Sequence, residues 1–64
     1  MKKEEMIYLA SKAADKGTDY DSLKYGDDLH GREKYAHTIW QYVEDYKEMG
    51  STAFREKYKE YKMY

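Results

Sequence analysis

The chain has 64 residues, 39% of them charged, with a formal net charge of −1 at pH 7, nine tyrosines, and neither cysteine nor proline. This length predicts one small domain over residues 1–64. The lack of cysteine excludes disulfides and thiolate metal sites, and the near-zero charge favours neither nucleic acid nor an acidic mimic of it. The longest apolar run, residues 6–10, is too short for a signal peptide or a membrane span. We therefore expect a cytoplasmic protein without a membrane partner.

Tyrosine is the commonest apolar residue, since nine tyrosines accompany only three leucines, two isoleucines, one valine and one phenylalanine. Each tyrosine ring carries a hydroxyl that needs a hydrogen-bond partner or water. Nine such rings are too many to bury in a chain of this size. We therefore expect some tyrosines on the surface, where aromatic rings are enriched at binding sites.

The hydrophobic pattern and the glycines predict an all-α protein, a small three-helix bundle with one additional short helical turn. The first helix is expected over residues 3–16, followed by Gly17 at position C′. Tyr8 points away from its apolar face. That face comprises Met6, Ile7, Leu9, Ala10, Ala13 and Ala14.

Residues 19–25 follow a capping-box pattern that begins at Thr18, and they form either a short helix ended by Gly26 or a loop. A long helix is predicted over residues 28–49, capped by Asp27 or Asp28 and followed by a C′ glycine. Its apolar residues cover about half of the helical wheel, and Ile39 and Trp40 are expected in the core. These apolar residues are Tyr35, Ala36, Ile39, Trp40, Val43 and Tyr46.

The last helix is predicted over residues 52–63, with Ser51 or Thr52 as its cap. The connection from the long helix is only two or three residues, which predicts an αα-hairpin or a sharper corner. Phe54 is expected to point inward. Unless an earlier helix covers them, the tyrosines that follow form an exposed aromatic patch beside a basic flank. The predicted partner-binding residues are Tyr58, Tyr61, Arg55, Lys59, Lys62 and Tyr8.

The polar residues show no catalytic or metal-binding pattern. His30, Glu33 and His37 share one side of the long helix, but its two histidines would lie about 10.5 Å apart along the axis, too far to bind one ion easily. Adjacent acids such as Glu44 and Asp45 have no cleft in which to perform general acid–base catalysis. We therefore expect no metal, no cofactor and no enzymatic activity.

The composition resembles that of small accessory proteins of low-GC bacteria and their phages, although no residue motif assigns a family. The leading hypothesis is a non-enzymatic protein-binding module, such as an inhibitor, adaptor or accessory factor, that presents tyrosines to a protein partner inside the host cell. One alternative is a nucleic-acid-binding protein that uses the basic, aromatic C-terminal helix. Another alternative is a self-associating structural protein.

Overall fold

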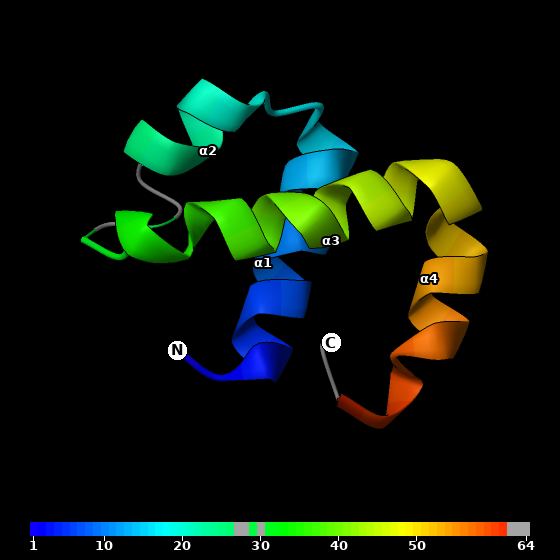
Figure 1. Cartoon of the computed structure of the whole chain (residues 1–64). Coiled ribbons are helices and arrows are strands. Elements are labelled where there is room, and N and C mark those ends of the chain that lie inside the picture. The colour runs from blue at the N-terminus through cyan, green and yellow to red at the C-terminus, as the bar shows by residue number, and fades with distance from the viewer. Residues whose placement is uncertain (27–28, 30, 62–64) are drawn as a thin grey trace.

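The computed structural model describes residues 1–26, 29 and 31–61, and every regular element in this part of the chain is helical (Figure 1). This confirms the predicted all-α fold with one short additional helix. The α-helices are α1 (Lys3–Lys16), α2 (Tyr20–Tyr25), α3 (Ala36–Met49) and α4 (Ser51–Lys57). Two 3-10 turns, η1 (Glu33–Tyr35) and η2 (Lys59–Tyr61), precede α3 and follow α4.

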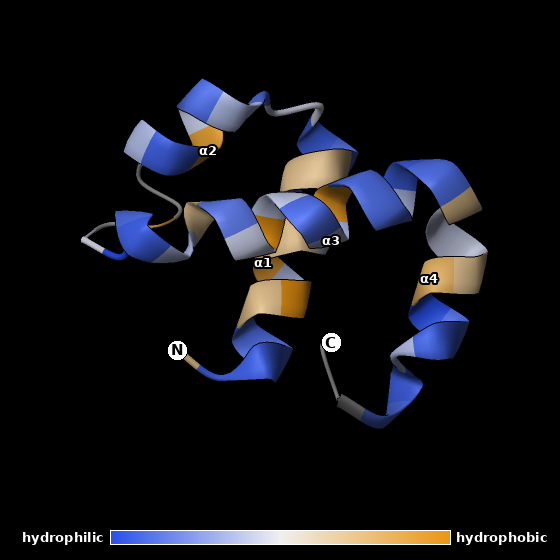
Figure 2. Cartoon of the chain, viewed as in Figure 1, coloured by the Kyte–Doolittle hydropathy of each residue, from blue (hydrophilic) through white to orange (hydrophobic). Residues whose placement is uncertain are grey.

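The helix α3 is the central element, because the other three helices all pack around it. It crosses in front of α1, while α2 lies above its N-terminal half and α4 descends from its C-terminal end (Figure 1). Hydrophobic residues are concentrated where α3 crosses α1 and on the inner sides of α2 and α4 (Figure 2). The core therefore follows the length of α3 rather than filling one central layer.

The C-terminus of α1 is determined by local chemistry, and it lies where the sequence predicts it. Gly17 adopts the left-handed conformation with φ 72°, which costs little for a residue without a Cβ atom. Its N–H donates to the carbonyl of Ala14 at 3.1 Å, and the N–H of Thr18 donates to the carbonyl of Ala13 at 2.9 Å. These two bonds form a Schellman motif, which satisfies carbonyls that the helix end would otherwise leave unpaired.

The helix α2 forms, so the helical interpretation of residues 19–25 is confirmed over the loop interpretation. Its N-cap is Asp19 and not Thr18: the Asp19 carboxylate accepts a hydrogen bond of 2.8 Å from the backbone N–H of Ser22. This hydrogen bond lowers the pKa of Asp19, because it stabilises the ionised carboxylate. Leu23 is the residue through which α2 reaches the core, and it is fully buried.

The prediction of the long helix was wrong in its N-terminal part, because α3 begins at Ala36 rather than near residue 28. Gly31 has φ 82°, which is incompatible with a continuous right-handed helix, and the N–H of Arg32 closes a tight turn onto the carbonyl of Leu29. This turn places Leu29 in the core and lets Arg32 form a 3.1 Å ion pair with Glu5 of α1. The expected caps, Asp27 and Asp28, lie outside the described residues.

The last helix also differs from its prediction at both ends. Gly50 is both the residue that ends α3 and the N-cap of α4, so neither Ser51 nor Thr52 provides a side-chain cap. At Tyr58 the backbone leaves the helical conformation, with φ −111° and ψ 22°, and the chain continues as η2 instead of a single helix over 52–63.

The core consists of two clusters on the two sides of the α1–α3 crossing. The first, which we call the N-terminal cluster, joins α1, α2 and α3. The second, the aromatic cluster, joins α1, α3 and α4. The N-terminal cluster comprises Ala10, Ala13, Leu23, Leu29, Ala36, Ile39 and Val43. The aromatic cluster comprises Ile7, Tyr46, Phe54 and Tyr58.

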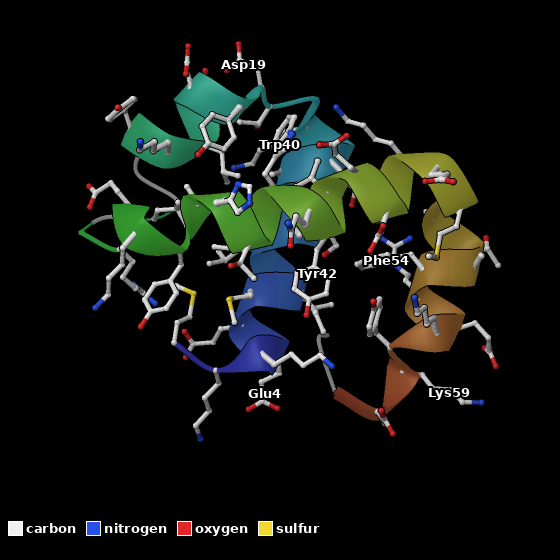
Figure 3. All side chains as sticks on the ribbon, viewed as in Figure 1. Glu4, Asp19, Trp40, Tyr42, Phe54 and Lys59 are labelled. Carbon is white, nitrogen blue, oxygen red and sulfur yellow. The ribbon has the colours of Figure 1, made fainter. Side chains whose placement is uncertain are left out.

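Ile39 is fully buried in the N-terminal cluster, as predicted. Trp40 is not a core residue: it is only half-buried and packs at the edge of that cluster. It lies on the side of α3 that faces α2, whereas Tyr42 lies on the opposite side (Figure 3). The sequence pattern placed Trp40 on the broad apolar face of the helix, but the short helix α2 covers only part of its ring.

Candidate binding surfaces

The three rings of the aromatic cluster and the adjacent ring of Tyr42 form a row of contacts between α3 and α4, which we call the aromatic row. The ring centroids of Tyr42 and Tyr58 are 5.9 Å apart, those of Tyr58 and Phe54 are 4.8 Å apart, and those of Phe54 and Tyr46 are 5.1 Å apart. Phe54 is fully buried, which confirms its inward orientation, and it turns from α4 toward the centre of the molecule (Figure 3). Such edge-to-face and tilted pairs add stability beyond the buried area.

The exposed patch predicted for the C-terminal tyrosines was wrong at Tyr58, whose exposed fraction is 7%. The earlier helices do extend alongside this end of the chain, because Tyr42 on α3 and Tyr8 on α1 both pack against the aromatic cluster. A stacking surface for nucleic-acid bases therefore has no exposed ring at Tyr58. The side chain of Tyr61 and the whole of Lys62 lie outside the described part of the structure.

The remaining predicted binding residues do not form one surface. Lys59 turns outward and pairs with Glu56 at 2.9 Å, whereas Arg55 pairs with Asp15 of α1 at 3.2 Å (Figure 3). Both described cations of the basic flank are thus already bound to carboxylates. Tyr8 is half-buried against the aromatic cluster instead of pointing away from the core, with the Lys12 ammonium 5.2 Å from its ring centroid.

A polar group links α1, α3 and α4, and we call it the Asp15 bridge (Asp15, Tyr46 and Arg55). The Tyr46 hydroxyl donates a hydrogen bond to one oxygen of the Asp15 carboxylate, and the other oxygen accepts the Arg55 ion pair. The Arg55 guanidinium also lies 6.0 Å from the centroid of the Tyr46 ring. Burial of the ring raises the pKa of Tyr46, and the adjacent Asp15 carboxylate raises it further. The sequence shows no signal for this bridge, because its members are 9 to 40 positions apart.

Two groups of aromatic and lysine side chains lie on and beside α2, where the sequence predicted no binding surface. The rings of Tyr20 and Trp40 meet edge to face with centroids 5.7 Å apart, and the Lys47 ammonium lies 5.0 Å from the Trp40 ring. At the end of α2, Tyr25 is 72% exposed and Lys24 lies 5.3 Å from its ring. We call this set the α2 surface: Tyr20, Lys24, Tyr25, Trp40 and Lys47.

Several lysines contact aromatic rings instead of carboxylates. Each of them lies 5.0 to 5.3 Å from a ring centroid. Within the described residues none of them forms an ion pair. Their charge is therefore available to an incoming acidic group. They are Lys12, Lys24, Lys34, Lys47 and Lys57, over Tyr8, Tyr25, Tyr35, Trp40 and Tyr58.

The side chains that could act in catalysis or bind a metal ion are dispersed over the described part of the chain. No group of three or more His, Asp or Glu side chains in this part could hold a metal ion, and His30 lies outside it. The Nε2 atom of His37 is 3.3 Å from the side-chain nitrogen of Gln41 on the exposed side of α3. None of the described helices combines the length and apolar character needed to cross a membrane.

Comparison of the chain with protein-family models, with curated proteins and with solved structures found no match.

Proposed function

We propose that the protein is a non-enzymatic binding module, of the inhibitor, adaptor or accessory type, that recognises another protein through the α2 surface. The observation that carries this proposal is the position of Trp40. The only tryptophan of the chain is half-buried at the edge of the core, against Tyr20 and under Lys47. Tryptophan and tyrosine are the residues that most often anchor protein interfaces, because they bury a large area and lose little conformational freedom.

The rest of the α2 surface suits the same role. The six residues of α2 span about 9 Å along the helix axis, so one partner can contact both of its ends. Tyr25 presents the most exposed large apolar side chain of the described residues. Lys24 and Lys47 have no carboxylate partner among these residues and can pair with acidic side chains at the rim of an interface.

Site-specific photo-crosslinking in cells of the native source tests the proposal. A benzophenone amino acid replaces Tyr25 in one variant and Thr52 in a control variant, because both residues are exposed on helices but Thr52 lies on α4. We expect a covalent adduct with a different protein from position 25 and not from position 52. Equal adducts at both positions, or adducts with nucleic acid alone, would contradict the proposal.

Binding of the crosslinked partner then measures the contribution of the surface. The double change Lys24→Ser, Tyr25→Ser should weaken binding at least tenfold, the effect of losing one interface anchor. The matched control Lys34→Ser changes a lysine that lies over Tyr35 in the same way, 5.2 Å from the ring, and should leave binding unchanged. Aromatic anchoring also predicts weak salt dependence, unlike binding through phosphates.

A further inference from the structure

The connection between α3 and α4 is a single glycine in an unusual backbone conformation. Gly50 has φ 90° and ψ 157°, a region that residues with a Cβ atom scarcely occupy. A Cβ atom built at Gly50 would meet no other atom within 4 Å. A larger residue at position 50 would therefore be disfavoured by its backbone conformation and not by a steric clash. Short connections of this kind favour the exchange of an element between two copies of a chain.

The sequence on both sides of Gly50 is also compatible with one continuous helix. The buried residues Tyr46, Phe54 and Tyr58 are spaced so that Gly50 occupies the same helical stripe, four residues from Tyr46 and from Phe54. The hinge already contains two bonds of helical spacing, from the N–H of Gly50 to Tyr46 and from that of Phe54 to Gly50. If the chain straightened at Gly50, residues 36–57 would form one helix about 33 Å long that contains no proline.

Straightening would separate α4 from the surface that it covers within its own chain. That surface consists of Ile7 on α1 with Tyr42 and Tyr46 on α3, and it would lose contact with Phe54 and Tyr58. The Asp15 bridge would also lose Arg55. A second copy of the chain offers the same docking surface, with the same apolar rings and the same carboxylate.

We propose that α4 together with η2 is an exchangeable arm, which docks either on its own chain or on α1 and α3 of a second copy to form a domain-swapped dimer. In the dimer each arm covers the aromatic cluster of the other chain, and each Arg55 pairs with the Asp15 of the other chain. Gly50 controls the equilibrium between the monomer and the domain-swapped dimer, because it permits the bent conformation and opposes the straight helix. This interaction uses a surface different from the α2 surface and goes beyond the proposed binding function.

The substitution Gly50→Ala tests the hinge. Alanine is strained in the bent form and is the best helix former in the straight one. Relief of strain at two hinges per dimer should raise the dimerisation constant by roughly thirtyfold or more. Sedimentation equilibrium of the wild type and of G50A over a wide concentration range measures this change.

The matched control is Gly17→Ala, because Gly17 also has a positive φ, 72°, and no atom within 4 Å of a built Cβ, but it connects no exchangeable arm. G17A should not change self-association. A folded G50A chain that associates no more than the wild type, or equal association of both glycine variants, overturns the proposal.

A second test leaves the hinge unchanged and does not depend on the folding of G50A. Asp15→Arg and Arg55→Asp each place like charges at positions 15 and 55 of one chain. When the two variants are mixed and refolded together, exchange of the arms brings opposite charges together at both docking sites. Native mass spectrometry should then show the mixed dimer in excess over both homodimers. Absence of the mixed dimer, or its formation only in statistical proportion, overturns the proposal.

Discussion

At the scale of single residues, the tyrosines that the structure describes differ widely in burial. The dipeptide Lys–Tyr occurs at positions 24–25, 34–35 and 57–58, and in each case the lysine lies over the ring of the adjacent tyrosine. Yet Tyr25 is 72% exposed, Tyr35 is half-buried and Tyr58 is 7% exposed. The same dipeptide therefore carries a tyrosine of very different burial at the three sites.

This difference predicts opposite results for the same substitution. Tyr58→Ser should destabilise the fold by about 3 kcal/mol, because it leaves a cavity between Phe54 and Tyr42 and exposes the rest of the aromatic row. Tyr25→Ser should change stability by no more than about 0.5 kcal/mol, as expected for an exposed position. Urea unfolding followed by circular dichroism measures both. Equal effects of the two substitutions would show that burial does not distinguish these tyrosines.

At the scale of secondary-structure elements, α2 is the helix most dependent on its cap. It has six residues and one fully buried side chain, Leu23, so its packing contributes little to hold it helical. Isolated helices of this length do not form in water. The hydrogen bond from the Ser22 N–H to Asp19 satisfies one of the N–H groups at its start, and the negative charge of Asp19 interacts favourably with the helix dipole.

The substitution Asp19→Ala should therefore unfold α2 locally, while Asp19→Asn, which retains the capping oxygen, should preserve most of it. The lowered pKa of Asp19 means that its stabilising effect is present above its ordinary pKa and is lost as the pH falls through the lowered value. Amide hydrogen exchange of residues 20–25, measured for both variants, tests the cap. Equal protection in D19A and in the wild type would show that tertiary packing alone maintains α2.

At the scale of the whole molecule, the Asp15 bridge connects the three helices that surround the aromatic cluster. The Asp15 carboxylate accepts from Tyr46 and Arg55, which belong to α3 and α4. Tyr46 itself is 8% exposed and contacts Phe54, so its hydroxyl connects the buried aromatic row to the protein surface. The Asp15 bridge is thus a polar group that is joined to the aromatic cluster through Tyr46.

The raised pKa of Tyr46 predicts a loss of stability in alkaline solution. A group whose pKa is higher in the folded state stabilises that state below its unfolded pKa, about 10 for tyrosine, and this contribution is lost as the pH rises through the folded value. Tyr46→Phe removes the titrating group, so its stability should fall less than that of the wild type over the same alkaline range. Thermal unfolding at a series of pH values compares them, and parallel curves would contradict the assignment.

Features determined by neighbouring residues could be predicted from the sequence. The bounds of α1, the left-handed Gly17 and the end of α3 at Gly50 all follow from periodicity and local backbone preferences. These interactions span four or five residues, so they are nearly independent of the rest of the fold.

Features that depend on how the helices cross could not be predicted in this way. Tyr58 is covered by Tyr42 of α3, and Tyr8 of α1 packs against the same cluster. The half-buried position of Trp40 reflects how far α2 extends over α3. A helical wheel shows which side of a helix is apolar, but it does not show where the neighbouring helix ends. Only the tertiary structure therefore decided which tyrosines lie in the core and which aromatic rings remain exposed to solvent.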